Sequence, residues 1–213
     1  MRYSFNERLA KKLGLDKKEI TILKKLNSPQ KIQDFLRALP GNFEKKSETL
    51  MSPRLVLQHK ICHCMEGALF AALVLWLHGR EPLLVDIKAK SNDLDHVITV
   101  FKENGYWGAI SKTNHYQCRY RDPIYKNVRE LLMSYFHEYF LAKTGQKTLL
   151  SYSKPYNLKS LKDISWAISP KPLWHISKIL DTISHLPFIL NKKVLLRRAD
   201  KFEQKIARIP EYP

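Results

Sequence analysis

One cysteine of this sequence stands where a helix is predicted to begin. Residues 62–79 read CHCMEGALFAALVLWLHG, so Cys64 directly precedes a long apolar run. A cysteine in the first helical turn meets unpaired backbone N–H groups and the positive end of the helix dipole, and both favour the thiolate. Glu66 adds a favourable charge to this turn, although a nearby carboxylate raises rather than lowers a thiol pKa. The sequence indicates Cys64 as a candidate nucleophile.

A base for this nucleophile is offered by His96, the first residue of the extended run HVITVF. When a helix is followed by an antiparallel sheet, the natural packing lays the start of the helix against the strands. A thiolate and an imidazolium within hydrogen-bond reach can attack a carbonyl and form an acyl-enzyme. We therefore expect Cys64 and His96 to meet and act as a catalytic pair.

The sequence predicts one helix that precedes Cys64 and a second helix that begins near it. Ser28-Pro29 supplies a capping serine and a proline at the first helical position, and Pro40-Gly41 ends the amphipathic pattern that follows. Residues 42–60 show no clear periodicity and predict an irregular segment. The next helix begins near Cys64 and ends at Gly79, a typical left-handed cap residue.

The pattern then changes to strands. Residues 83–89 and 96–101 are rich in β-branched and apolar side chains, and Asn104-Gly105 is a strong signal for a hairpin turn into a third strand over 106–110. A helix therefore leads into an antiparallel sheet.

The second half of the chain is predicted to be mainly helical. Asp122-Pro123 opens a helix over roughly residues 124–143, and a short strand over 149–152 rejoins the sheet. Two further helices follow, one containing residues 176–183 and one after Asn191. We expect three parts, which are an N-terminal helical region over 1–60, a core over 61–152 and a C-terminal helical annex over 153–213.

The composition is that of a globular protein with an excess of positive charge. The formal net charge of +17 comes mainly from residues 1–60 and 151–213, which favours a solvated Lys-rich surface with weak, general attraction to anionic surfaces. The longest apolar run, residues 68–77, is half of the ~20 residues that a membrane-spanning helix needs. With no secretory signal in the first residues, we expect a cytoplasmic protein without a transmembrane segment.

The order of these features resembles the transglutaminase-like branch of the papain-type cysteine enzymes. In that family a cysteine at a helix start is followed by a strand that begins with histidine and by a strand with tryptophan that ends in aspartate, which DHVITVF and GYWGAIS match in part. The resemblance covers residues 61–123. It implies an α+β fold with a buried helix on an antiparallel sheet, Cys64 as the nucleophile, His96 as its base and Trp107 as the strand tryptophan.

The third member of the implied triad departs from the family pattern. The acidic residue usually lies four positions after the tryptophan, and Ser111 stands there. Asn114 could instead supply an amide, as in the Cys-His-Asn arrangement of papain relatives, provided that the chain turns first. We expect Asn114 to orient His96, with Ser111 as the alternative, because Asp95 would point to the other face of the strand. Gln58 lies where papain relatives place an oxyanion-stabilising glutamine, which this family does not require.

The resemblance implies a cysteine hydrolase or acyltransferase that needs no cofactor or metal and acts on an amide, ester or thioester carbonyl of a peptide, a protein or a small molecule. One alternative is a catalytically inactive binding module of the same fold, whose basic flanks engage acidic partners. Another is a structural zinc protein, because thiolates and imidazoles are preferred zinc ligands and Cys62, Cys64, His115 and Cys118 form a Cys-x-Cys and a His-x-x-Cys pair. A zinc-bound Cys64 could not attack a substrate, so the zinc and nucleophile interpretations exclude each other.

Overall fold

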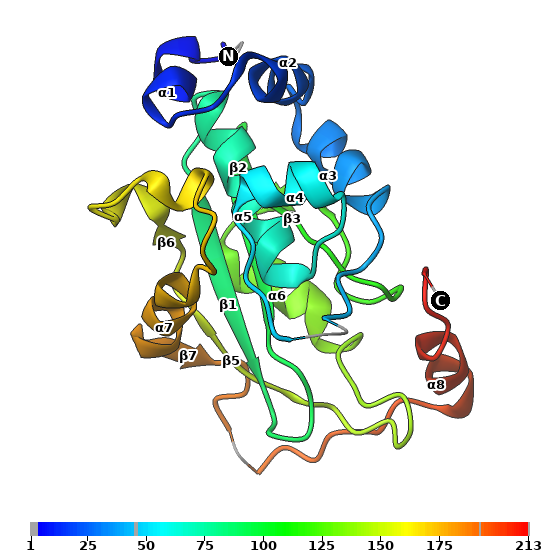
Figure 1. Cartoon of the computed structure of the whole chain (residues 1–213). Coiled ribbons are helices and arrows are strands. Elements are labelled where there is room, and N and C mark those ends of the chain that lie inside the picture. Colours follow the sequence, from blue (N-terminus) through cyan, green and yellow to red (C-terminus); the bar gives the residue numbers. More distant parts are fainter. Residues whose placement is uncertain (1–3, 45–46, 192, 213) are drawn as a thin grey trace.

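An antiparallel sheet forms the centre of the structure, a computed structural model that describes residues 4–44, 47–191 and 193–212 (Figure 1). In this part of the chain the sheet has seven strands in the order β4-β3-β2-β1-β5-β7, and β6 also pairs with β1. The strands are β1 (Leu83–Ala89), β2 (His96–Glu103), β3 (Tyr106–Ile110), β4 (Arg121–Tyr125), β5 (Leu149–Ser153), β6 (Tyr156–Asn157) and β7 (His185–Pro187). With helices packed on it, this sheet confirms the expected α+β class.

The hairpin between β2 and β3 forms where the sequence predicts it. Asn104 and Gly105 have φ angles of 50° and 88°, the left-handed backbone that a two-residue type I′ turn requires at both positions. The turn fixes the register in which Glu103 faces Tyr106. This register places Ser111, the residue after β3, near the start of β2.

The central helix α5 (Cys64–Leu77) packs against β2 and is buried except for Cys64 and Trp76, which are partly exposed. A helix that is apolar on all sides needs cover on all sides. The Thr99 hydroxyl of β2 donates to the Ala68 carbonyl of α5 at 2.6 Å, which fixes the helix on the sheet. The start of α5 is thereby held close to the first residue of β2.

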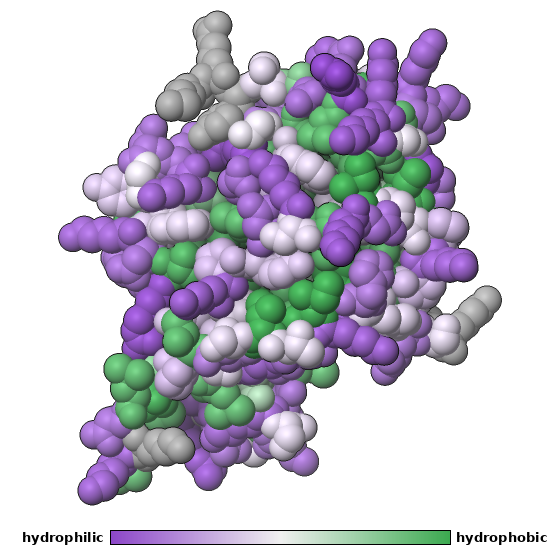
Figure 2. All heavy atoms as spheres, turned by 90° about the vertical axis from the view of Figure 1, so that its left-hand side faces the viewer, coloured by the Kyte–Doolittle hydropathy of each residue, from purple (hydrophilic) through white to green (hydrophobic). Residues whose placement is uncertain are grey.

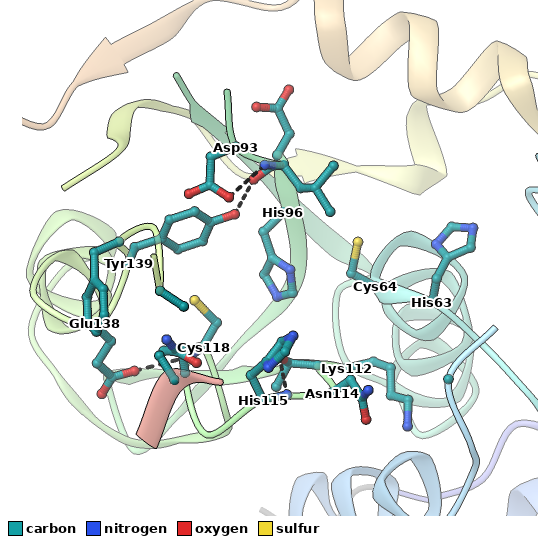
Figure 3. Close-up of a pocket in the computed structure, with 18 of the residues that line it drawn as sticks. His63, Cys64, Asp93, His96, Lys112, Asn114, His115, Cys118, Glu138 and Tyr139 are labelled. Atoms are coloured by element: carbon teal, nitrogen blue, oxygen red, sulfur yellow. Dashed lines mark hydrogen bonds between the residues drawn. The ribbon is translucent and has the colours of Figure 1, made fainter. Parts of the chain in front are cut away.

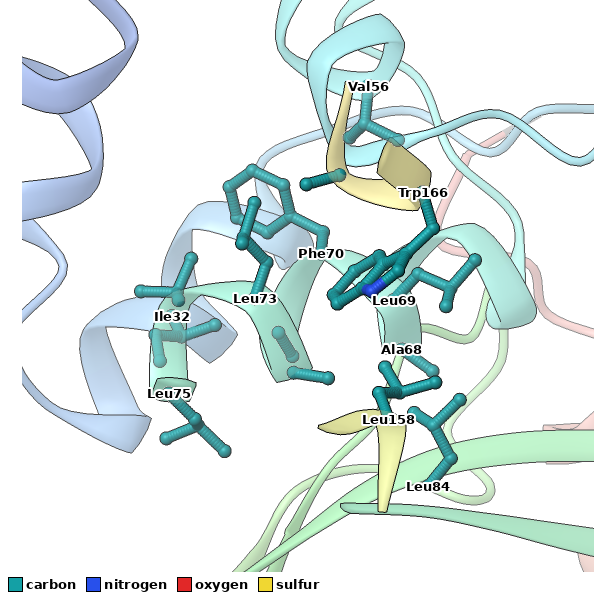
Figure 4. Close-up of a cluster of buried hydrophobic side chains, with 14 of the residues drawn as sticks. Ile32, Val56, Ala68, Leu69, Phe70, Leu73, Leu75, Leu84, Leu158 and Trp166 are labelled. Atoms are coloured by element: carbon teal, nitrogen blue, oxygen red, sulfur yellow. The ribbon is translucent and has the colours of Figure 1, made fainter. Parts of the chain in front are cut away.

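Shorter helices cover the outer side of α5. They are α1 (Glu7–Lys12), α2 (Lys17–Lys25), α3 (Pro29–Arg37) and α4 (Pro53–His59). Phe35 of α3 stacks on Phe70 of α5 with the ring centroids 5.0 Å apart. Figure 4 shows the cluster that results, to which Trp166 contributes from the C-terminal part of the chain. The three parts expected from the sequence therefore share one hydrophobic core.

The other face of the sheet is covered by α6 (Val128–Phe136). Successive strand residues point to opposite faces, so Val97 and Phe101 of β2 join the cluster around α5 while Ile98 and Val100 join the cluster around α6. Because β2 is apolar on both faces, it is buried in the middle of the sheet.

Two segments within residues 1–152 differ in secondary structure from the prediction. The helix predicted over 124–143 is limited to α6, because residues 121–125 form the strand β4 and Asn127 caps the helix by accepting a hydrogen bond from the Glu130 amide. Pro123 is tolerated in β4 because this strand lies at the edge of the sheet. Residues 42–60, predicted to be irregular, contain α4.

The C-terminal part is also less helical than predicted. Besides α7 (Trp174–Thr182), α8 (Lys201–Ala207) and the short 3-10 helices η1 (Leu158–Ser160) and η2 (Ser165–Ala167), it contains β6 and β7. The strand β7 joins the sheet beside β5, and His185 of β7 lies 3.0 Å from the buried carboxylate of Asp86 in β1. Such short strands are fixed by tertiary contacts that have no periodic signature in the sequence.

Hydrophilic side chains cover most of the face shown in Figure 2, with apolar side chains gathered in smaller patches between them. Within the described ranges, no single helix is long and apolar enough to cross a membrane. The pair α4 and α5 would reach that length only with a bend of 111° between the two helices.

We predict that Gly67→Ala destabilises the protein. A Cβ atom at Gly67 would lie 2.6 Å from Cβ of Lys112, and the Lys112 amine is itself held by the Leu36 carbonyl at 3.1 Å. Overpacking of this kind costs about 1–3 kcal/mol, which exceeds the gain of about 1 kcal/mol in helix propensity. Denaturant unfolding should show a lower free energy of unfolding. A variant at least as stable as the parent would contradict this prediction, because it would show that α5 and the segment containing Lys112 can move apart without cost.

Candidate active site

Cys64, the first residue of α5, lies in the wall of a cavity of about 430 Å³ (Figure 3). The cavity is open to solvent, and Cys64 is partly exposed in it. Its walls come from segments far apart in the sequence, namely residues 41–43, 62–64, 93–96, 112–118 and 138–142, together with Ala207 of α8. The predicted nucleophile is thus accessible to a small molecule or to an extended chain.

Two imidazoles flank the Cys64 sulfur. Figure 3 shows the sulfur between the rings of His63 and His96. Burial raises the Cys64 pKa, but hydrogen bonding and the positive charge of the two rings lower it by more, to about 5. The predicted pair of Cys64 and His96 is brought together, and the lowered pKa favours the thiolate form of Cys64.

His96 is oriented by Ser111. The His96 Nε2 atom lies 2.8 Å from the Ser111 hydroxyl, which leaves Nδ1 as the nitrogen available to the sulfur. The Ser111 backbone is held in turn by the Gln33 side chain of α3, which donates to its carbonyl and accepts from its amide, each at 2.9 Å. The alternative that the sequence left open is therefore the arrangement observed.

Asn114 does not have the orienting role expected for it. It lines the cavity, but its side chain is paired with the backbone of Tyr212, donating at 3.0 Å and accepting at 2.8 Å. The strand β3 ends at Ile110, and the irregular chain that follows directs the Asn114 amide toward the C-terminal segment. An offset counted along a regular strand does not hold beyond the end of that strand.

The other residues that the sequence singled out lie away from the reacting atoms. Asp95 accepts hydrogen bonds from the Ala89 amide and the Lys88 amine, as expected for a side chain on the other face of the strand. Gln58 is exposed on α4 and is not part of the cavity wall. Trp107 packs in the cluster around α6.

His63 was not predicted as a site residue. It precedes α5 as the N-cap, and its Nε2 lies 3.1 Å from the Thr49 carbonyl and 3.4 Å from the Glu66 carboxylate. Burial lowers the His63 pKa, but the contact with Cys64 and the charge of Glu66 raise it by more, to about 9. Its Nδ1 accepts a hydrogen bond from the Met65 amide at 3.2 Å, a contact that the neutral ring makes and that the protonated ring, which donates from both nitrogens, gives up. The sequence signal for this role is a histidine three residues before a glutamate at a helix start.

The Glu66 carboxylate is fully buried and organises this end of the cavity. It accepts hydrogen bonds from the His63 amide at 3.0 Å, from the Met51 amide at 2.8 Å and from the side chains of Asn42 and Thr49. A buried carboxylate with this many donors is well satisfied. Its charge favours a protonated His63, so the carboxylate acts on the thiolate through that ring.

The other two cysteines have neither the partial exposure nor the lowered pKa of Cys64. Cys62 and Cys118 are buried, and burial raises the pKa of Cys62 to about 12 and also raises that of Cys118. Among the described residues, which include both cysteines and His115, no group of three or more His, Cys, Asp or Glu side chains could hold a metal ion. The zinc interpretation of Cys62, Cys64, His115 and Cys118 is therefore not supported by their arrangement.

Comparison with protein-family models gave no match for this chain, and a search of the curated proteins gave no similar sequence. The chemistry that the site can perform follows from its geometry, in which a partly exposed cysteine sulfur lies between two imidazoles at a helix start and a serine holds one of these imidazoles.

We predict that iodoacetamide alkylates Cys64 at low pH. Only the thiolate reacts, so the rate should rise with pH, reach half its maximum near the Cys64 pKa of about 5 and change little above neutrality. Mass spectrometry of the labelled peptide measures this. His63→Ala or His96→Ala should move the midpoint upward because each removes a group that lowers the pKa. Fast labelling that persists in Cys64→Ser, or a midpoint near 8.5, the ordinary value for a thiol, would contradict the prediction.

Proposed function

We propose that this protein is a cysteine hydrolase or acyltransferase of the transglutaminase-like type, in which Cys64 attacks an amide, ester or thioester carbonyl. The observation that carries the proposal is the position of the Cys64 sulfur, partly exposed in a cavity and flanked by His63 and His96. A buried structural cysteine would have a raised pKa, as Cys62 has, whereas that of Cys64 is lowered.

The proposed reaction begins with addition of the Cys64 sulfur to the carbonyl carbon. The carbonyl electron pair moves to oxygen, and the oxyanion accepts a hydrogen bond from the Cys64 amide, which as the first amide of the helix has no carbonyl partner within it. The C–N, C–O or C–S bond to the leaving group then breaks, and His96 gives its proton to the departing atom. The product of this half-reaction is a thioester on Cys64.

Release of the acyl group reverses these roles. Water or an amine gives a proton to the neutral His96 ring as it attacks the thioester, and the Cys64 thiolate leaves. Water as acceptor makes the protein a hydrolase, and an amine makes it a transferase. The cavity of about 430 Å³ has room for either acceptor beside the acyl group.

His63 supports this cycle in a way that Ser111 cannot. A serine orients the His96 ring but adds no negative charge to offset it, unlike the aspartate of the family pattern. His63, held beside the buried Glu66 carboxylate, provides a second positive charge next to the sulfur. Together with His96, it stabilises the Cys64 thiolate before the attack and again as the thiolate leaves the thioester.

The arrangement of the elements also supports the transglutaminase-like assignment. The cysteine begins the central helix, the histidine begins the strand β2 against which that helix packs, and the orienting residue directly follows β3. The difference from the family pattern is the serine in place of the acidic residue.

A second candidate function is a binding module that engages anionic partners. It is favoured by the net charge of +17 and by the neutral Ser111 in place of a carboxylate. Such binding should weaken steeply with salt and should be unaffected by Cys64→Ala.

We predict that p-nitrophenyl acetate acetylates Cys64. Intact-protein mass spectrometry should show a single acetyl adduct, which hydroxylamine removes as expected for a thioester. Cys64→Ala should form no adduct, and His96→Ala should form it about 10²–10⁴-fold more slowly because proton transfer is lost. An adduct that is unchanged in Cys64→Ala would refute the proposal.

We further predict that Ser111 is a positioning residue. Loss of one hydrogen bond of about 1–1.5 kcal/mol in Ser111→Ala should slow acetylation by about tenfold, and Ser111→Thr should restore most of the rate. Gln33→Ala should have a smaller effect in the same direction. The pH at which the rate is half-maximal should shift in Ser111→Ala, whereas a purely structural defect would lower the rate equally at every pH.

A further inference from the structure

The Asn114 side chain makes a peptide-recognition contact with a segment of this same chain. It accepts a hydrogen bond from the Tyr212 amide at 2.8 Å and donates one to the Tyr212 carbonyl at 3.0 Å. The Asn114 backbone carbonyl also accepts from the Glu211 amide at 2.7 Å. These three hydrogen bonds hold two consecutive residues through their backbone atoms alone, so any peptide with the same backbone conformation could form them.

The side chains around this contact favour an acidic residue followed by an aromatic one. The Glu211 carboxylate lies 2.9 Å from the Arg119 guanidinium and 3.8 Å from that of Arg37. The Lys112 amine lies 5.0 Å from the centroid of the Tyr212 ring, within the range of a cation–π contact. The Tyr212 hydroxyl donates to the Arg37 carbonyl.

The contact lies at the wall of the cavity that contains Cys64. Lys112 and Asn114 line this cavity, and Ala207 at the end of α8 lines it from the C-terminal side. The segment that follows α8 therefore lies against the loop that forms one wall of the candidate active site. Figure 1 shows the C-terminal end of the chain beside α8 at the edge of the molecule.

We propose that the surface around Asn114 is a subsite for a peptide segment with an acidic residue followed by an aromatic one, and that Glu211 and Tyr212 occupy it as an internal ligand. The proposal rests on the proposed function in that it names a peptide or protein as the substrate class of the same cavity. A tethered segment has an effective concentration in the millimolar range, so it competes with any peptide that binds from solution.

Peptide binding to protein with the segment removed tests this proposal. A fluorescent peptide with the sequence of residues 208–212 and blocked ends is titrated against two Cys64→Ser proteins, one with the full chain and one ending at Pro210. We expect the shortened protein to bind the peptide at least about tenfold more tightly, because its subsite is free. Tyr212→Ala with Glu211→Arg in the full chain should free the subsite in the same way without shortening the chain.

A matched peptide with an N-methylated tyrosine amide lacks the donor to Asn114 and should bind about tenfold more weakly. A peptide with lysine in place of the glutamate should also bind more weakly because Arg37 and Arg119 would repel it. Asn114→Ala in the shortened protein should remove the difference between the methylated and unmethylated peptides. Circular dichroism spectra identical to that of the parent are the control for folding.

Equal affinity of the full-length protein and both freed forms, or of the methylated and unmethylated peptides, would overturn the subsite. The proposed function can fail separately, because binding is measured without the nucleophile. If the peptide binds as expected but p-nitrophenyl acetate gives no adduct on Cys64, the result supports the subsite and refutes the proposed acyl chemistry. If the adduct forms but the peptide does not bind, only the subsite falls.

Discussion

The site depends on one electrostatic requirement, which is that a negative sulfur within a folded protein must face positive charge. Removal from water penalises the thiolate, and the free amides at the start of α5 offset only part of that cost. His63 and His96 supply the rest from opposite sides of Cys64. The long apolar helix can carry a reactive thiolate at its first residue because its own N-cap supplies one imidazole and the start of β2 brings the other.

The two imidazoles are held by different kinds of groups. His96 is held through Ser111 by the side-chain amide of Gln33, so neutral groups fix the direction of its ring. His63 lies beside the buried carboxylate of Glu66, which favours its protonated form. One ring is therefore suited to exchanging a proton during a reaction, and the other to retaining one. His63 thus supplies beside the sulfur a charge that the neutral Ser111 does not.

Much of this arrangement could be read from the sequence, where the signals were local. The capped start of α3, the apolar helix from Cys64 and the turn at Asn104-Gly105 follow from residue preferences over a few positions. The orienting residue depends on where the chain turns after β3, and residue spacing alone does not determine that turn. His63 was missed because its role depends on a carboxylate whose burial is a property of the whole fold. The strands β6 and β7 are too short for their pairing to be visible as a pattern.

The Gln33 contact with Ser111 also bears on how the protein is made. Gln33 is synthesised before Cys64, whereas its partner Ser111 is synthesised after both Cys64 and His96. A nascent chain that has exposed Cys64 but not yet His96 lacks one of the two imidazoles that lower the Cys64 pKa. The thiol would gain the effect of both rings only after the hairpin has been synthesised and α3 has docked on it, so an incomplete chain would carry a less reactive cysteine than the folded protein.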